Sequence, residues 1–186
     1  MAKGGTVKTV VLYESMFGAT RKIAEAIAEG ARTHSEVTVV PLADQASASV
    51  AGADLIIVGA PTHALTMPTA ASRKQAVEWT EDPKKDLELD NGAPETGVKE
   101  WLENVPASQN RYATFDTRTG LMSHFPGSAA AQIDKALHKR RMTRIARPES
   151  FVVENSGALR VGEEARATQW GAAVAGASSA AGAVPA

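Results

Sequence analysis

The sequence has no cysteine, few aromatic residues and no excess of charge of either sign. The absence of cysteine from the 186 residues excludes disulfides, thiolate zinc sites, iron–sulfur centres and a cysteine nucleophile. Twenty basic and 21 acidic residues give a net charge of -1, which argues against a dedicated nucleic-acid-binding protein. Aromatic residues make up only 5% of the chain, so we expect a core of small and branched aliphatic side chains.

Long apolar runs are also missing. No stretch approaches the ~18 consecutive apolar residues that a membrane span requires, and the first residues contain no apolar run of signal-peptide length. We therefore expect a cytoplasmic protein that does not enter the membrane. His34, His124 and His138 share no spacing typical of a metal site, so the sequence predicts no metal ligands.

Apolar, β-branched segments alternate with segments of helical periodicity. The nearly continuous apolar character of the first and third such segments indicates strands buried on both faces, as in a parallel sheet covered by helices. The second segment alternates and ends in a proline, which suits an edge strand. Strands are predicted over 7–13, 36–41, 54–60, 111–117 and 150–154, and helices over 20–31, 72–79, 96–104, 128–142 and 162–174.

The length suits one domain, predicted over residues 1–175. Residues 64–95 interrupt the alternation and are predicted to form an inserted loop, exposed and polar over 81–95. Within it, Ser72 with Gln75 three residues later predicts the start of a short helix. A loop of this length often has a binding role or forms a lid. The Ala/Ser/Gly-rich residues 176–186 are predicted to form a flexible tail.

Parallel sheets bind ligands outside the carboxyl ends of their strands, where the strand order reverses. Three loops of the sequence meet that description, at 14–20, 61–69 and 116–127. We expect them to converge on one site.

The first of these loops has the composition of an anion site. Ser15 and Thr20 flank Gly18 directly before a helix. Backbone N–H groups of such a turn and the positive end of the helix attract phosphate, and the hydroxyls can add donors. Arg21 and Lys22 follow where acidic residues are normally preferred, so a bound phosphate would relieve that conflict; the alternative is that both are simply solvated.

Several phosphate-binding motifs do not match this loop. It lacks the GxxxxGK[ST] pattern of nucleoside triphosphatases, and its single glycine does not make the GxGxxG pattern of Rossmann dehydrogenases. Glu14 stands alone after the first strand and the third strand ends in Ala60 and Pro61, which excludes a response-regulator receiver. A low-molecular-weight phosphatase would need a cysteine nucleophile.

Residues 11–27, VLYESMFGATRKIAEAI, resemble the flavodoxin signature. That signature has two aliphatic residues, an aromatic, Ser or Thr, a small residue, an obligatory Thr, then Ala and an aliphatic. Residues 54–62, which end in Gly-Ala-Pro-Thr, are similar to the second flavin loop of the family. The resemblance implies an α/β, flavodoxin-like three-layer sandwich, with a five-stranded parallel sheet in the order 2-1-3-4-5 and FMN at the strand ends.

The resemblance also implies which residues contact FMN. One group would hold the 5′-phosphate, a second would lie along one side of the isoalloxazine ring, and a third would approach its other side and its pyrimidine edge. It assigns no catalytic residue. In that order, the three groups are Ser15, Met16, Phe17, Gly18, Ala19 and Thr20; Pro61, Thr62 and His63; and Asp116, Thr117, Arg118, Thr119 and Gly120.

Two functions are compatible with these residues. The first is an FMN-binding protein that transfers electrons to a redox partner protein, or an FMN-dependent oxidoreductase that reduces a small acceptor such as a quinone. The second is a flavodoxin-fold binding or regulatory module that has lost firm flavin binding. It is favoured by His63 at a position where an aromatic is common, and by the lack of aromatics in 117–120. Trp79, Phe17, Phe115 and Phe125 would supply stacking only if the chain folds back suitably.

Overall fold

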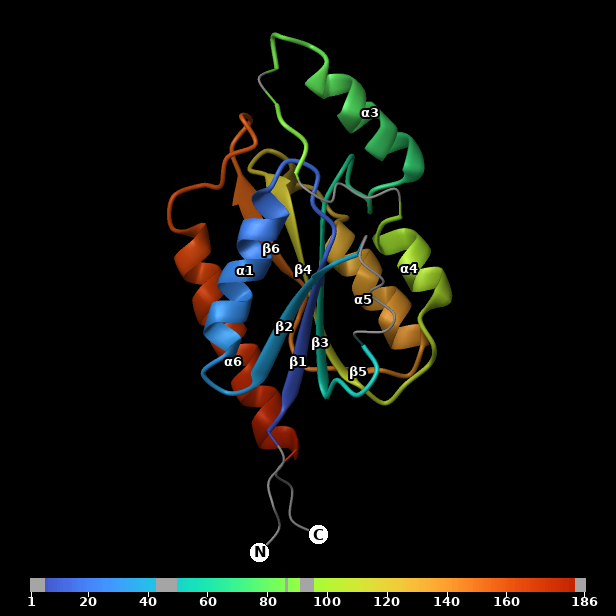
Figure 1. Ribbon diagram of the computed structural model, residues 1–186, viewed down its shortest axis with the longest axis vertical. Helices are drawn as coiled ribbons and strands as arrows, with labels where there is room; N and C mark the ends of the chain where they lie inside the picture. Colours follow the sequence, from blue (N-terminus) through green and yellow to red (C-terminus); the bar gives the residue numbers. More distant parts are fainter. Residues whose placement is uncertain (1–5, 43–49, 86, 91–95, 183–186) are drawn as a thin grey trace, which may run out of the picture.

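Parallel strands form the centre of the structure, a computed structural model that describes residues 6–42, 50–85, 87–90 and 96–182 (Figure 1). In each strand the chain runs toward the same edge of the sheet, beyond which α3 lies (Figure 1). The elements follow in the order β1 (Lys8–Tyr13), α1 (Ala19–Ala31), β2 (Glu36–Pro41), β3 (Leu55–Pro61), α3 (Ala70–Thr80), α4 (Val98–Asn104), β4 (Arg111–Thr119), η1 (Met122–His124), α5 (Ala129–Lys139), β5 (Thr143–Arg144), β6 (Glu149–Val153) and α6 (Glu163–Gly182).

The strand order is β2-β1-β3-β4-β5, with β6 also paired to β4. Every pairing is parallel, which confirms the predicted α/β fold and the order 2-1-3-4-5. Two segments share the fifth position: β5 pairs with the start of β4, and β6 pairs with β4 from Phe115 to Thr119. Strand β5 has only two residues, so it carries no alternation from which the sequence could predict it.

Alternate strand residues enter two separate cores, one on each face of the sheet. Val11, Ile57 and Phe115 pack beneath α1 and α6, whereas Leu12 and Ile56 pack beneath α4 and α5. This arrangement confirms the three-layer sandwich (Figure 1). The burial of β1 and β3 on both faces explains their continuous apolar sequences, and β2 is an edge strand as predicted.

Helix α6 is longer than predicted, because its small residues form a packing face. The helix predicted to end near 174 continues to Gly182, and Ser178 is fully buried. A Cβ on Gly171 would lie 2.1 Å from the carbonyl oxygen of Ile27 in α1, so only glycine permits this approach. Gly30, one residue before the end of α1, makes the reciprocal contact with α6. Residues 183–186 of the predicted tail lie outside the described residues.

Other boundaries also differ from the predictions. Helix α3 is capped by Thr69, with Ser72 as the reciprocal partner in a capping box, whereas Ser72 was expected to begin it. Strand β4 continues to Thr119, two residues beyond its predicted end, and α5 covers Ala129–Lys139 rather than 128–142. Residues 81–85 and 87–90 are irregular as predicted; 91–95 lie outside the described residues. No helix among the described residues is long and apolar enough to span a membrane.

Candidate functional site at the carboxyl ends of the strands

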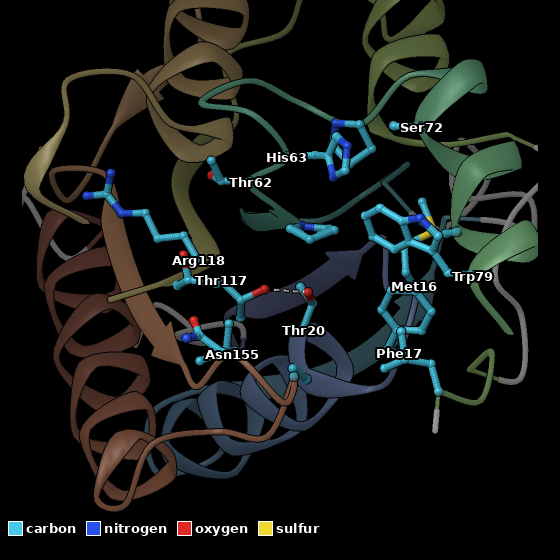
Figure 2. A pocket seen from close by; sticks show the side chains of 18 of the residues that line it. Met16, Phe17, Thr20, Thr62, His63, Ser72, Trp79, Thr117, Arg118 and Asn155 are labelled. Carbon is cyan, nitrogen blue, oxygen red and sulfur yellow. Dashed lines mark hydrogen bonds between the residues drawn. The ribbon is translucent and has the colours of Figure 1, made fainter. Parts of the chain in front are cut away.

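A cavity of about 240 Å³, here called the main cavity, lies where β1, β3, β4 and β6 end (Figure 2). All the predicted cofactor-binding residues except Ser15, Gly18, Asp116 and Gly120 line it. The three loops predicted to converge therefore do so. The lining residues are Met16, Phe17, Ala19, Thr20, Pro61, Thr62, His63, Pro68, Ser72, Ala76, Trp79, Leu87, Thr117, Arg118, Thr119, Val153, Glu154, Asn155 and Gly157.

The Ser15–Thr20 loop ends in an uncapped helix N-terminus. Gly18 is the N-cap of α1, has a left-handed φ of 91°, and provides no side-chain cap. The Ser15 hydroxyl accepts a hydrogen bond from the Gly18 N–H at 3.1 Å, which holds the turn closed. The first helical bond runs from the Lys22 N–H to the Gly18 carbonyl. The N–H groups of Ala19, Thr20 and Arg21 therefore have no partner within the helix.

A hydrogen bond joins the first and third predicted loops. The hydroxyl oxygens of Thr20 and Thr117 lie 2.8 Å apart, and both side chains are buried (Figure 2). When Thr117 donates, the Thr20 proton is free to point to another acceptor. An anion bound at this end of α1 could accept that proton, so Thr117 supports Thr20 from behind.

The Arg21 charge is compensated within the protein, which differs from the sequence expectation. Arg21 Nε donates to both carboxylate oxygens of Asp90, at 2.9 and 3.1 Å, and the Asp90 N–H donates to the Met16 carbonyl at 2.7 Å. The hydrogen bond to Asp90 is the main cause of the raised pKa of Arg21, with Glu25 contributing. A phosphate is therefore not needed to balance Arg21.

A second cavity of about 410 Å³ adjoins the main cavity. It shares Phe17, Ala19, Leu87 and Gly157 with the main cavity, and Lys22 lines it. Lys22 is exposed, in contrast to Arg21. A ligand longer than the main cavity could thus extend past Leu87 toward a free surface cation.

The N-terminus of α5, in contrast, is filled by protein groups. The Thr62 hydroxyl accepts from the Ala129 N–H at 2.8 Å, and the Asp116 carboxylate accepts from the Ala130 N–H at 3.0 Å. Asp116 is completely buried and does not line the main cavity. The expected contact of Asp116 with a flavin ring is thus not the arrangement found, because α5 requires that carboxylate as a cap.

The Arg118 guanidinium faces away from the centre of the main cavity (Figure 2). Its Nη1 lies 3.5 Å from the carbonyl oxygens of Met122 and Gly127, and its Nε lies 3.9 Å from an Asp116 oxygen. Strand β4 directs it there, because Asp116 and Arg118 are two residues apart and share a face. Arg118 therefore lines the main cavity on the side of Met122 and Gly127.

Three aromatic rings gather on the opposite side (Figure 2). The Phe17 and Trp79 rings are nearly parallel, with centroids 6.5 Å apart and an interplanar angle of 19°. The His63 ring lies 5.9 Å from that of Trp79, and the Lys85 ammonium lies 5.0 Å from the Trp79 centroid. The chain thus folds back so that Phe17 and Trp79 meet at the site. Of the other two aromatics considered, Phe115 is buried in the core against Phe151 and Trp170, and Phe125 does not line the main cavity. Helix α3 supplies the aromatic side chain that the loops after β3 and β4 lack.

A buried ion-pair network connects α3 to the end of β1. Arg73 Nη1 lies 3.4 Å from a Glu14 oxygen, and Arg73 Nη2 donates to Glu100 at 2.7 Å. Glu14 is fully buried and also accepts from the Val98 N–H at 2.8 Å. Burial raises the pKa of Glu14 despite these two donors. Desolvation would raise the pKa of Glu100, but its hydrogen bonds, above all the one from Arg73, outweigh this effect and lower the pKa.

Sequence reasoning did not place two parts of the lining at the site. Ser72, Ala76, Trp79 and Leu87 come from the 64–95 segment, whose return to the site no local pattern predicts. The loop 153–157 follows β6 and could have been found, because every strand of a parallel sheet ends at the same edge. Among the described residues, no three His, Cys, Asp or Glu side chains form a group that could hold a metal ion.

Comparison with known proteins agrees with this architecture. Residues 10–73 match the flavodoxin domain family. A flavodoxin from the domain Archaea is 17% identical, with a TM-score of 0.62 over 92% of this chain and 99% of that one. Flavodoxin 2 from Bacillus cereus is also 17% identical, with a TM-score of 0.63 over 91% and 99% of the two chains.

A longer protein contains the same fold. The rubredoxin oxygen:oxidoreductase from Desulfovibrio gigas is 17% identical, with a TM-score of 0.60 over 96% of this chain but only 37% of that one. A search of curated proteins finds no significant sequence match. The family match runs from β1 to the start of α3, and the structural matches extend the likeness in fold to nearly the whole chain. The resemblance drawn from residues 11–27 is thereby confirmed.

Proposed function

We propose that this flavodoxin-like protein binds FMN in the main cavity and uses it to transfer electrons to a partner protein or to a small acceptor such as a quinone. The observation that carries the proposal is the opening of an uncapped α1 N-terminus, with Thr20 beside it, onto a cavity whose far side is aromatic. These two features suit the two ends of a flavin mononucleotide: a phosphate dianion and a planar ring.

The residues present fit FMN at both ends. The free N–H groups of Ala19 and Thr20 and the Thr20 hydroxyl provide donors for a phosphate, without any acidic residue in the first turn of α1. Ligand pockets commonly measure about 300–1,000 Å³. The main cavity, at about 240 Å³, is small by that standard, but it continues into the adjoining cavity of about 410 Å³. Part of the ligand would therefore remain exposed.

When bound, FMN would supply the redox chemistry, and the protein would bind and orient it. Thr20, supported by Thr117, would hold the phosphate, and Ser15 would keep the loop in its binding conformation. Pro61 and His63 lie at the end of β3, where a ring would pass between the phosphate and the aromatic side chains. The mainly apolar lining excludes water from this region, which favours a planar, poorly charged acceptor such as a quinone over a highly charged one.

Electron transfer to a protein remains the other form of the same proposal. The D. gigas neighbour is named as an oxidoreductase acting with rubredoxin and oxygen, and the B. cereus neighbour as a flavodoxin. An exposed flavin edge would suit either kind of acceptor. We further infer that the protein is cytoplasmic, in agreement with the lack of a membrane-spanning helix among the described residues.

A second candidate is a binding or regulatory module that does not hold flavin firmly. Two observations favour it: the Arg21 charge is already used by Asp90, and His63 occupies the place of a larger aromatic in its loop. The two candidates differ in their affinity for FMN. Only the first requires a saturable complex whose strength depends on the Ser15–Thr20 loop.

The test is calorimetric titration of the purified apo-protein with FMN, together with the variants Thr20→Val and Thr33→Val. Thr20→Val removes a hydroxyl that would donate to a charged group, so its complex should weaken by about 1–3 kcal/mol. Thr33 is exposed at the other end of α1, and its hydroxyl bonds only the Gly30 carbonyl, so Thr33→Val should bind like wild type. Equal affinities for all three proteins would contradict phosphate binding at this loop.

A further inference from the structure

We propose that Trp79 of α3 recognises the planar ring of the ligand by stacking, and that Arg73 positions Trp79 for this role. The inference rests on the proposed function, because it concerns the ring end of the same cavity. The ligand class it specifies is a planar, electron-poor heteroaromatic ring. The recognising side chain would come from the inserted segment rather than from the loops that end β3 and β4.

The ring contacts indicate a wall built to receive a flat ligand. Trp79 lines the main cavity, lies nearly parallel to Phe17 and has the tilted His63 ring 5.9 Å away. All three side chains remain partly exposed, although closer packing in a core would bury more apolar surface. The electron-rich face of an indole attracts cations and electron-poor rings. Lys85, 5.0 Å from the Trp79 centroid, already uses that attraction.

Helix α3 is held by charge rather than by an apolar face. Its only buried residues are Arg73 and Ala76. Arg73 bridges Glu14, directly after β1, and Glu100 of α4, at 3.4 and 2.7 Å. A Cβ on Gly97 would come within 2.4 Å of both Arg73 and Glu14, so glycine at this position keeps room for the pair.

This anchor connects the two ends of the site. Glu14 immediately precedes the Ser15–Thr20 loop, and Trp79 follows Arg73 by six residues, less than two helical turns. The distance between the phosphate donors and Trp79 is therefore set through the Arg73–Glu14 ion pair. Because α3 has little apolar packing, loss of Arg73 should let Trp79 leave its position. Arg73 is thus a positioning residue, and Trp79 would touch the ligand.

The experiment compares the affinities of Trp79→Ala and Trp79→Phe for FMN, riboflavin and inorganic phosphate. Riboflavin retains the ring and lacks the phosphate. Trp79→Ala should weaken FMN and riboflavin by the same factor, roughly tenfold to hundredfold, and leave phosphate binding unchanged. Trp79→Phe keeps an aromatic face and should recover most of the loss. Trp170→Phe is the matched control, since Trp170 packs on Phe115 and Phe151 away from the main cavity.

Arg73 is tested in a double-mutant cycle read by riboflavin affinity and tryptophan emission. Arg73→Met should weaken riboflavin binding in wild type but not in the Trp79→Ala background, because both changes remove one contact. It should also shift the Trp79 emission toward that of an exposed indole. Arg73→Met with Glu14→Gln removes both buried charges and should behave the same way, which separates positioning from damage caused by an unpaired Glu14.

Three outcomes decide between these claims. If wild type binds FMN and riboflavin and Trp79→Ala binds riboflavin equally well, the ring-recognition claim is overturned while the proposed function stands. If Trp79→Ala weakens binding but Arg73→Met has an equal effect in both backgrounds, Arg73 does not act through Trp79. If wild type binds neither flavin, the proposed function fails and the inference fails with it.

Discussion

At the scale of single residues, the site depends on a few hydroxyl side chains that already make hydrogen bonds within the protein. The Ser15 and Thr62 hydroxyls accept from the Gly18 and Ala129 N–H groups, and the Thr20 hydroxyl can direct its proton toward the main cavity when it accepts one from Thr117. Asp116 is completely buried, accepts from the Ala130 N–H of α5 and does not line the main cavity. Polar residue type alone therefore overestimates how many of these groups face a ligand.

The conformation of Gly18 gives a test at this scale. Its φ of 91° is unfavourable for any residue with a Cβ, so Gly18→Ala should lower the free energy of unfolding by about 1–2 kcal/mol and weaken FMN binding by disturbing the N–H groups that follow. Gly52→Ala is the matched control: its φ is 80°, and a Cβ there would meet nothing within 4 Å. Urea unfolding should show a similar loss of stability for both variants, with FMN affinity lowered only in Gly18→Ala. An equal loss of affinity in Gly52→Ala would contradict the local explanation.

At the scale of secondary-structure elements, periodic patterns predicted the sheet well and the inserted segment poorly. The strands β1 and β3 are buried on both faces, so their sequences carry an unambiguous apolar run. Helix α3 buries little besides Arg73, and its place depends on a contact with Glu14, 59 residues away along the chain. Such a long-range ion pair leaves no periodic signal in the sequence. The cluster of Phe17, His63 and Trp79 therefore could not be placed from sequence.

Small residues were misleading for a different physical reason. In α6 they looked like a low-complexity tail, because composition does not distinguish a frayed segment from a close helix–helix contact. Gly171 and Gly30 each remove a Cβ that would collide with a facing backbone carbonyl. Helices α1 and α6 can approach this closely only because Gly30 and Gly171 have no side chain. Hydrophobicity scales do not identify such positions as packing sites.

The start of α6 gives a pH-dependent test. Desolvation would raise the pKa of Glu163, but hydrogen bonds from Arg166 and the Val152 N–H outweigh it, so the pKa is lowered on folding. A carboxylate with a lowered pKa adds stability above its unfolded value of about 4.3, and this stability is lost as the pH falls through the folded value. Glu163→Gln should be less stable than wild type at pH 7 by less than about 1 kcal/mol, since the group is partly solvated.

The difference between wild type and Glu163→Gln should disappear toward pH 3. Thermal melts across this range measure it. A difference that grows as the pH falls would contradict the assigned direction of the shift. The 153–157 loop, which lines the main cavity, precedes this helix. FMN titration of Glu163→Gln at pH 7 should therefore show only a small loss of affinity.

At the scale of the whole molecule, the fold places the loops after β1, β3, β4 and β6 and the helix α3 of the inserted segment around the main cavity. The flavodoxin-like order 2-1-3-4-5 brings the ends of β1, β3 and β4 together, and this much followed from the signature in residues 11–27. The sequence also indicated the scarcity of aromatics at the loops. It could not indicate that Phe17, His63 and Trp79 would assemble there, because their contacts join three distant segments.

The net charge of -1 is a property of the whole molecule that affects how a partner protein would approach. A partner protein would not be attracted by a strong overall field, so docking would depend on local contacts at the exposed part of the ligand. A small apolar acceptor would need no such field. The molecule as a whole is thus compatible with both kinds of acceptor in the proposed function, and both require flavin binding first.

Titration of the apo-protein with FMN, followed by flavin fluorescence, tests the central claim most directly. The account predicts saturable quenching of flavin fluorescence at one FMN per chain, because a bound ring would lie against Trp79 and Phe17. It also predicts quenching of tryptophan emission in wild type, and less of this quenching in Trp79→Phe. Flavin fluorescence that stays unquenched and unshifted throughout the titration would contradict it.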